Sequence, residues 1–153
     1  MLSLALLLAL SPPAAPVTAR VVGIVDGDTI TVLIERTQVR IRLNGIDCPE
    51  KGQPFGRAAT ELTSSLAFGK TVQVISHGPD RYGRTVADII LPGGKSLNQE
   101  LVRAGLAWWF RRYAPRDKTL ARLEEEARDA RRGLWRDEDP IPPWLWRKKG
   151  KLK

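Results

Sequence analysis

The sequence contains one cysteine and one histidine, and this scarcity excludes several classes of protein. Cys48 alone cannot form an intramolecular disulfide, so the fold must be stabilised by packing. A zinc site built from cysteines and histidines is excluded for the same reason. His77 would have to be the base of any Ser-His-Asp or Cys-His site. It stands beside a glycine and a proline in a predicted loop, and we interpret it as a surface side chain.

The first 19 residues contain no charged side chain and no hydrophobic run long enough to span a membrane. The run over residues 2–10 is shorter than the about 20 residues that a spanning helix needs, and two prolines follow it. Val17, Thr18 and Ala19 then form a small-x-small cleavage signal. We therefore predict an export signal peptide over residues 1–19, cleaved after Ala19, and a periplasmic or secreted protein. Because no Lys or Arg precedes the run, a mis-assigned start codon and an uncleaved tether are alternatives.

Composition and charge are those of a soluble globular domain with a basic surface. Hydrophobic residues make up 42% and charged residues 27% of the 153 residues, enough for one domain with a real core. The net charge of +8 favours a polyanionic partner such as nucleic acid over a basic protein without one. We place the domain at residues 20–136. The tail over residues 137–153 is proline-rich and then basic, which predicts an extended or mobile segment.

The apolar pattern predicts a mixture of strands and helices. Alternating or β-branched runs predict five strands, over residues 21–25, 30–34, 39–43, 71–76 and 86–91. Three helices are predicted over residues 54–68, 96–104 and 116–132, the second opened by a Ser96-x-x-Gln99 capping box. These elements indicate an α+β fold in which a five-stranded antiparallel barrel of the oligonucleotide-binding (OB) type carries three helices.

Acidic side chains stand where the predicted strands end. Asp26 and Asp28 flank Gly27, and an Asp-Gly pair between strands is typical of a hairpin, although a turn does not need the second aspartate. Asp47 and Glu50 follow the third strand. A barrel could bring Asp28 and Asp47 together as oxygen ligands. Without a set of thiol and imidazole ligands, such a site favours Ca²⁺ or Mg²⁺ over zinc or copper.

Arginines accompany these acids. Arg40 and Arg42 alternate with the apolar residues of the third strand and project from the same face, and Arg84 closes a glycine-bearing loop. Taken alone, each arginine would be interpreted as a surface ion pair. A guanidinium, however, offers a planar fork that matches phosphate oxygens. Arginines beside several carboxylates therefore predict a site that holds a hard cation and a phosphate together.

Three motifs in this order resemble those of the staphylococcal nuclease (thermonuclease) family. They are Gly23-x3-Gly27-Asp28-Thr29, Arg42-Leu43-x3-Asp47-x-Pro49-Glu50 and Asp80-x-Tyr82-Gly83-Arg84. The similarity continues through residues 98–107 and covers about residues 20–135. It implies an OB-type barrel with three helices and a Ca²⁺-dependent phosphodiesterase that acts on DNA and RNA and leaves 3′-phosphate ends. The implied protein is a monomer without a stable protein partner.

The resemblance also implies a role for each matching residue. Asp28 and Asp47 match the calcium-binding carboxylates, Cys48 matches the residue whose backbone carbonyl binds the ion, and Asp26 matches an acid that acts through water. Glu50 matches the general base. The phosphate-clamping arginines and the substrate contacts correspond to Arg42, Arg84, Tyr82 and Tyr113, to which we add Arg40 and Arg111, the latter at the position of a family tyrosine.

Two other functions are compatible with parts of the sequence. A non-catalytic nucleic-acid-binding module on the same barrel needs the basic surface and the aromatics, but it has no use for Asp28, Asp47 and Glu50 together with two arginines. A basic structural protein of the cell envelope would use the N-terminal apolar run and the lysine-rich tail.

Overall fold

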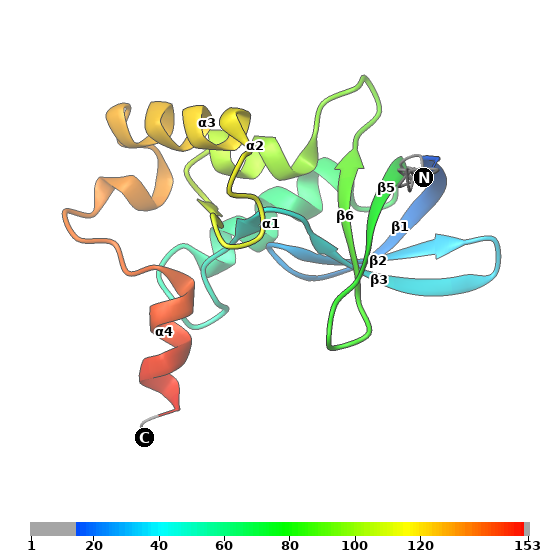
Figure 1. The fold of residues 1–153 in the computed structure, drawn as a ribbon, viewed down its shortest axis with the longest axis horizontal. Coiled ribbons are helices and arrows are strands. Elements are labelled where there is room, and N and C mark those ends of the chain that lie inside the picture. The colour runs from blue at the N-terminus through cyan, green and yellow to red at the C-terminus, as the bar shows by residue number, and fades with distance from the viewer. Residues whose placement is uncertain (1–14, 152–153) are drawn as a thin grey trace, which may run out of the picture.

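The computed structural model describes residues 15–151, and these residues form the expected α+β architecture (Figure 1). Five strands close a barrel in the order β1-β2-β3-β6-β5, and two short strands, β4 and β7, form a separate sheet. The strands are β1 (Val17–Asp26), β2 (Thr29–Ile34), β3 (Thr37–Leu43), β4 (Ile46–Asp47), β5 (Thr71–Pro79), β6 (Thr85–Ile90) and β7 (Trp108–Trp109).

Helices cover one side of the barrel. Figure 1 shows α1, α2 and α3 gathered there, whereas α4 stands apart from them near the C-terminus. Within residues 15–151 the helices are α1 (Gly56–Ala67), α2 (Leu97–Arg103), α3 (Lys118–Asp129), the 3₁₀ helix η1 (Gly133–Arg136) and α4 (Pro143–Gly150). The first three α-helices confirm the prediction, and α4 is an addition to it.

The barrel is not antiparallel throughout, which corrects the predicted topology. β3 and β6 run parallel, with Ile41 opposite Thr85 and Leu43 opposite Ala87, while the other neighbouring pairs of the barrel are antiparallel. The reason is geometric. In a closed ring with an odd number of strands, direction cannot alternate at every neighbour, so one pair must be parallel. β3, which carries Arg42, is one of the two strands of that parallel pair.

The C-terminal segment is helical rather than extended over α4, which corrects a second expectation. Pro143 occupies the first turn, where its missing N–H and fixed φ favour helix initiation. The Trp144 ring lies 5.5 Å from the rings of both Trp108 and Phe110. Before the helix, the Gln53 side-chain amide donates a hydrogen bond to the Ile141 carbonyl at 2.6 Å. These contacts join the tail to the rest of the protein.

β1 begins upstream of the predicted export-signal cleavage point. Val17 pairs with Val74, and Ala19 pairs with Val72 and is buried. Cleavage after Ala19 would remove residues 17–19 from the β1–β5 ladder. Residues 1–14 lie outside the described part of the chain, so the signal peptide stays a prediction.

Over residues 15–151, none of the helices has the length and apolar character of a membrane span.

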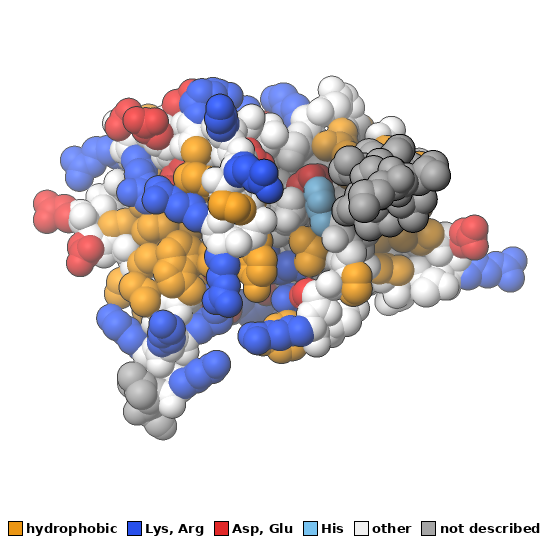
Figure 2. Space-filling model, viewed as in Figure 1, with side chains coloured by type: hydrophobic (Ala, Val, Ile, Leu, Met, Phe, Trp, Pro, Cys, Tyr) orange, Lys and Arg blue, Asp and Glu red, His pale blue; other side chains and the backbone are white. Residues whose placement is uncertain are grey.

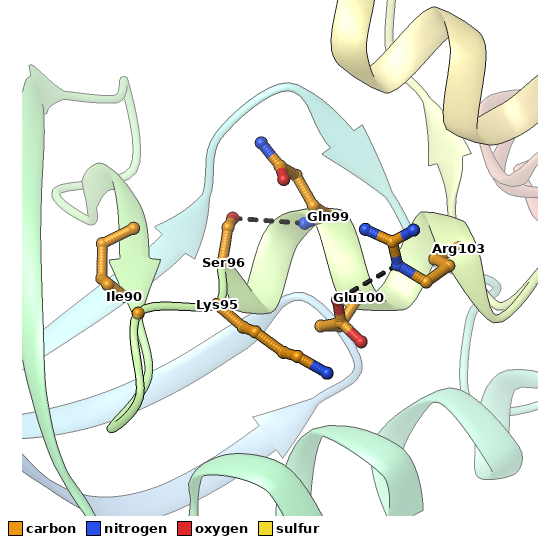
Figure 3. Close-up of a pocket in the computed structure, with 7 residues that line it drawn as sticks. Ile90, Lys95, Ser96, Gln99, Glu100 and Arg103 are labelled. Carbon is orange, nitrogen blue, oxygen red and sulfur yellow. Dashed lines mark hydrogen bonds and ion pairs between the residues drawn. The ribbon is translucent and has the colours of Figure 1, made fainter.

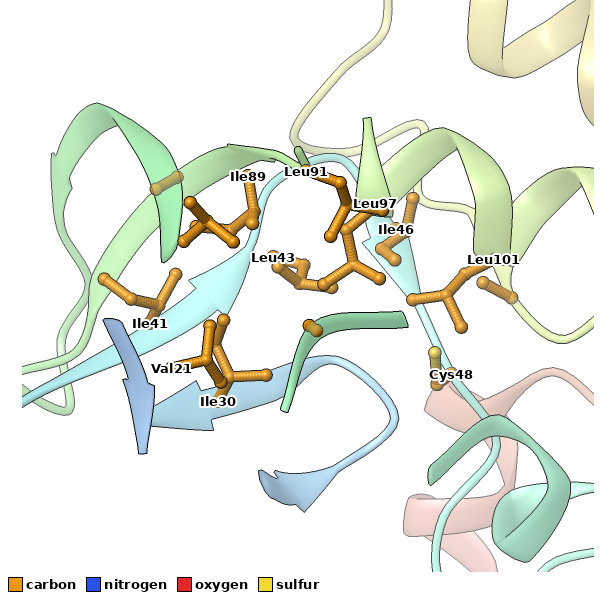
Figure 4. Packing of buried hydrophobic residues seen from close by; sticks show 14 of the residues in the cluster. Val21, Ile30, Ile41, Leu43, Ile46, Cys48, Ile89, Leu91, Leu97 and Leu101 are labelled. Atoms are coloured by element: carbon orange, nitrogen blue, oxygen red, sulfur yellow. The ribbon is translucent and has the colours of Figure 1, made fainter. Parts of the chain in front are cut away.

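The core lies inside the barrel and extends under α2 (Figure 4). Ile41 and Leu43 of β3 point inward with Ile30 of β2, and each is at most 1% exposed. Leu97 and Leu101 of α2 are fully buried and cover one end of this interior. The inward direction of Ile41 and Leu43 places Arg40 and Arg42 on the opposite face of β3, as the alternation predicts.

Asn98 is a buried polar side chain that joins α2 to the barrel. Its Oδ1 accepts a hydrogen bond from the Ile89 N–H at 3.1 Å. Its Nδ2 donates to the carbonyls of Asn44 and Ala87 at 3.0 and 3.2 Å. The side chain is thus bonded to β6 and to the residue that follows β3, which fixes the end of the strand that carries Arg42.

Replacing Asn98 by alanine is expected to destabilise the protein by about 2–4 kcal/mol, because one N–H and two carbonyl groups would lose buried partners. Urea-induced unfolding followed by fluorescence measures the loss. Gln99→Ala is the matched control, because the Gln99 side chain makes none of these bonds, and a change within about 0.5 kcal/mol is expected there. Equal losses in both variants would contradict the assignment.

Candidate active site

Two carboxylates from different segments meet at one guanidinium. Asp28 lies in the β1–β2 turn, Asp47 ends β4, and Arg42 projects from β3. Nη2 of Arg42 lies 3.6 Å from Oδ2 of Asp28 and 3.4 Å from Oδ1 of Asp47. Its Nη1 donates to the carbonyls of Leu43 and Ile46 at 2.8 and 2.9 Å. The guanidinium is therefore fixed in place between the two aspartates.

The electrostatics of this group favour an additional positive charge. Asp28 and Asp47 are only 7% and 1% exposed. Burial and the charge of Asp28 raise the pKa of Asp47, although hydrogen bonding to Arg147 and the charge of Arg42 oppose the rise. Burial also acts to lower the pKa of Arg42, but the two aspartates more than offset this effect and raise it. Four acidic side chains, Asp26, Asp28, Asp47 and Glu50, gather around two guanidinium groups, the partly buried Arg42 and Arg147 of the C-terminal segment. Acidic groups therefore outnumber the arginines, and a cation would offset the excess.

Close packing holds the turn that carries Asp28. The Thr63 hydroxyl of α1 donates to the Gly27 carbonyl at 2.6 Å. A Cβ at Gly27 would lie 2.8 Å from Cβ of Ala59 and 2.9 Å from Cβ of Cys48, so α1 packs directly on a turn that needs glycine. The Cys48 N–H donates to Oδ2 of Asp28 at 2.7 Å. The helix thereby fixes the backbone on which the carboxylate stands.

Cys48 contacts the carboxylate of Asp28 through its backbone N–H rather than through its thiol. The residue is 3% exposed, and burial together with the charge of Asp28 raises the pKa of the thiol well above its ordinary value. The side chain is therefore a neutral apolar group in the core. Asp26 is the last residue of β1, and its Oδ1 accepts a hydrogen bond from the Asp28 N–H at 3.1 Å.

Glu50 follows β4 in a loop that is braced by Gln53. The Glu50 N–H donates to Oε1 of Gln53 at 3.0 Å, and the Gln53 N–H donates to the Glu50 carbonyl at 2.9 Å. A Cβ at Gly56 would overlap the Glu50 carbonyl oxygen, so only glycine at the start of α1 allows this close approach. The Glu50 side chain remains partly exposed and faces the same region as Asp47.

Arg84 reaches this region from the β5–β6 loop. Its Nε donates to Oδ2 of Asp80 at 2.7 Å, and its Nη1 lies 3.5 Å from Oγ1 of Thr29, the residue after Asp28. Burial acts to raise the pKa of Asp80, but hydrogen bonds from Arg84 and Tyr82 dominate and lower it, so this acid stays ionised. Arg84 thus reaches the residue next to Asp28, whereas Arg42 contacts Asp28 itself, and the phosphate-clamping role of both arginines stays a prediction.

Arg147 of α4 is a site residue that the sequence did not reveal. Its Nη2 lies 2.7 Å from Oδ2 of Asp47, and its Nη1 lies 2.6 Å from Oε1 of Glu50. Hydrogen bonding to Asp47 raises its pKa further above the ordinary value for arginine, although burial opposes this. The one available signal was the spacing of Trp144 and Arg147, which places both on one face if the tail is helical.

Residues 40–137 match the model of a protein family described as "Staphylococcal nuclease homologue". The chain belongs to the staphylococcal nuclease family. It is 50% identical over 133 residues to a protein of Escherichia coli O157:H7 named "Uncharacterized endonuclease", covering 87% of this chain and 86% of that protein. It is 43% identical over 157 residues to "Micrococcal nuclease" of Shigella flexneri, covering 96% and 90%. An "Uncharacterized endonuclease" of Haemophilus influenzae is 38% identical over 136 residues, covering 88% and 75%.

The remaining predicted contacts of this family member lie around the carboxylates rather than on them. Tyr82 is 69% exposed, and its ring centre is 5.5 Å from Cζ of Arg84. Tyr113 is equally exposed and packs against Phe110. Arg111 lies over the Trp109 ring, and Arg40 is exposed on β3. No hydrogen bond or ion pair among residues 15–151 joins these four side chains to Asp28, Asp47 or Glu50, so their roles stay predictions.

The donor atoms suit a hard cation, provided that backbone and solvent complete its coordination. Over residues 15–151, no three His, Cys, Asp or Glu side chains lie close enough to form a metal site by themselves. Asp28 and Asp47 supply carboxylate oxygens, and the Cys48 carbonyl is close in sequence. Because every candidate donor is oxygen, the set matches calcium or magnesium and not a thiolate-binding metal.

A groove beside α2 is separate from this site (Figure 3). Glu100 and Arg103 on its wall form an ion pair at 3.2 Å, and the Ser96 hydroxyl caps α2 by accepting from the Gln99 N–H at 3.3 Å. These polar groups have helix-stabilising partners, and none belongs to the family motifs. The groove therefore does not bear on the chemistry of the carboxylates.

The Asp26→Asn variant is expected to alter how stability depends on pH in the absence of divalent cations. Burial, together with the charge of Asp28, raises the pKa of Asp26 from 3.8 to about 6. The folded protein therefore holds this proton more tightly than the unfolded chain, and stability falls as the pH rises from about 4 through 6. The asparagine variant lacks this fall. From pH 4 to pH 7, the free energy of unfolding of the variant relative to that of wild type should rise by about 1–2 kcal/mol. The pKa change corresponds to ~3 kcal/mol, which solvent screening reduces.

Urea unfolding at several pH values measures this difference, and the exposed Asp139→Asn variant serves as the control. A stability difference between Asp26→Asn and wild type that stays constant from pH 4 to 7 would contradict the assigned pKa.

Proposed function

We propose that the protein is a Ca²⁺-dependent endonuclease that hydrolyses phosphodiester bonds of DNA and RNA and leaves 3′-phosphate ends. The observation that carries the proposal is the meeting of Asp28 and Asp47 at Arg42 in a member of the staphylococcal nuclease family. The names of its relatives, endonuclease and micrococcal nuclease, support the reaction class. A cation site, a phosphate clamp and a candidate base would then lie at one edge of an OB-type barrel.

The cation would be held by Asp28 and Asp47, with the Cys48 carbonyl and water completing its coordination and Asp26 acting through water. Bound calcium would neutralise the negative charge of the phosphodiester and orient it. Support comes from the burial of both carboxylates and from the Cys48 N–H bonded to Asp28, which keeps that backbone segment beside the ligands. The acidic side chains Asp26, Asp28, Asp47 and Glu50 outnumber the guanidinium groups of Arg42 and Arg147, which favours uptake of a divalent ion.

Arg42 and Arg84 would clamp the phosphate from two directions. Arg42 is anchored through Nη1 by two backbone carbonyls, which leaves Nη2 directed toward the carboxylate site. Arg84 is held through Nε by Asp80, and its terminal nitrogens extend toward Thr29. Both guanidinium groups stay protonated, so they stabilise charge on the phosphoryl oxygens as it develops. Arg84 would stabilise the leaving 5′ oxygen by donating a hydrogen bond rather than a proton.

Glu50 would act as the base that orients a water and removes its proton for in-line attack at phosphorus. Its backbone is held by Gln53 and by the tight contact with Gly56, while its side chain remains partly exposed to solvent. Once its Oε1 is released from Arg147, which contacts it at 2.6 Å, this carboxylate can bind water and accept its proton as the new bond forms. The fixed backbone limits where that water sits relative to the clamped phosphate.

Substrate would lie across the exposed residues around the site. Tyr82 and Tyr113 present exposed rings that suit base stacking, and Arg40 and Arg111 add positive charge. Figure 2 shows Lys and Arg side chains distributed over the visible face and clustered around α4. We further propose that the protein acts as an exported monomer without a stable protein partner. The uncharged N-terminal segment supports export.

A cleavage assay tests the proposed function. Purified protein should cut plasmid DNA and single-stranded RNA internally in millimolar Ca²⁺ and lose this activity when a chelator is in excess. The products should carry 5′-hydroxyl ends, which a polynucleotide kinase labels without prior phosphatase treatment. Tight binding of nucleic acid without cleavage under either condition would contradict the proposal and favour a non-catalytic binding module.

Replacing Glu50 by glutamine tests the proposed base. The amide retains the shape of the side chain but cannot accept the proton, so kcat should fall by about 10²–10⁴-fold while KM for DNA changes little. The matched control is Glu125→Gln, which removes the same charge from an exposed position on α3. Unchanged kcat in the Glu50 variant would remove this residue from the mechanism.

A further inference from the structure

The C-terminal helix places a positive charge on the carboxylates that the proposed cation needs. Nη2 of Arg147 lies 2.7 Å from Oδ2 of Asp47, and its Nη1 lies 3.2 Å from Oδ1 of the same residue. The same Nη1 is 2.6 Å from Oε1 of Glu50. Both oxygens of a carboxylate that is nearly inaccessible to solvent are thus engaged by one guanidinium, and so is the candidate base.

We propose that Arg147, held in place by α4, competes with the divalent cation for the site. The arginine binds Asp47 and Glu50 until the ion displaces it, and α4 moves away with it. The inference rests on the proposed metal site. It deepens that proposal by making the C-terminal helix an autoinhibitory element of the same site.

Competition follows from the geometry. A calcium ion bound to Asp47 would take an oxygen at about 2.3–2.6 Å, and both oxygens already contact Arg147. Ion and guanidinium would then repel each other across one carboxylate in a poorly screened, mostly buried environment. The same contact engages an oxygen of Glu50 that a water would otherwise occupy. Loss of the arginine therefore makes both acids available in one step.

The attachment of α4 is limited enough to be reversible. The helix has eight residues, fewer than the about 12–15 that an isolated helix needs in water, so its contacts must hold it in place. Those contacts include the buried Pro143, the packing of Trp144 against Trp108 and Phe110, the Gln53–Ile141 hydrogen bond and the Arg147 ion pairs. Leu145 is 44% exposed, and Figure 1 shows the helix extending away from the other helices. Release of the ion pairs would remove a large part of this attachment.

Calcium binding, measured by calorimetry without nucleic acid, tests the proposal. The Arg147→Ala variant should bind Ca²⁺ about tenfold or more tightly than wild type, a change of about 1.4 kcal/mol in binding free energy. Lys148→Ala is the matched control, because it removes the same charge from the next position of α4, which is exposed. Its affinity should stay within about twofold of wild type, as expected for a distant, screened surface charge.

Hydrogen exchange gives a second readout that does not depend on activity. In wild type, Ca²⁺ should increase amide exchange over residues 143–150, whereas exchange in α1 should not rise. Equal Ca²⁺ affinity in Arg147→Ala and wild type, or unchanged exchange in α4, would overturn the inference and leave the proposed function intact. Absence of Ca²⁺ binding in every variant would overturn the proposed metal site, and this inference with it.

Discussion

The burial of two aspartates against one arginine is the interaction on which the rest of the structure depends. Asp28 and Asp47 are close to inaccessible, and ionised groups in such positions are costly unless they are paired and hydrogen-bonded. Arg42 can serve both because two carbonyls hold its other nitrogen in place. The register that sets Thr29 opposite Arg42 then fixes the distance between the β1–β2 turn and β3. A small displacement of either strand would separate the charges.

The helices α1 and α2 and the loop before α1 contribute to this arrangement through polar side chains. Thr63 of α1 bonds to the turn before Asp28, Gln53 bonds to the loop at Glu50, and Asn98 of α2 bonds to the end of β3 and to β6. Each side chain fixes a short piece of backbone that carries or supports a charged residue. The barrel supplies the strands, and these contacts determine where the strand ends lie. The candidate site is therefore precise although Asp28, Glu50 and Arg84 are on turns and loops.

Local patterns were sufficient to predict the barrel strands and the acidic side of the site. The alternation along β3 predicted that Arg42 points away from the core, and the second aspartate of the Asp-Gly-Asp turn was interpreted as functional rather than structural. The parallel pairing of β3 with β6 could not be predicted from local patterns, because it follows from closing a ring of five strands. The start of β1 at Val17 was missed, because small residues before Arg20 also fit a cleavage signal.

Long-range contacts explain why the C-terminal part of the site was missed. Proline and lysine enrichment predicts an extended tail, and the helix forms where Trp144 reaches aromatic rings more than 30 residues earlier in the chain. Arg147 meets Asp47 across 100 sequence positions. The lone cysteine has another consequence. Its thiol is buried beside Gly27 and Asp28, so a thiol-reactive dye can label the protein only when this region opens. The rate of labelling at Cys48 thus reports on how often the β1–β2 turn that carries Asp28 opens in solution.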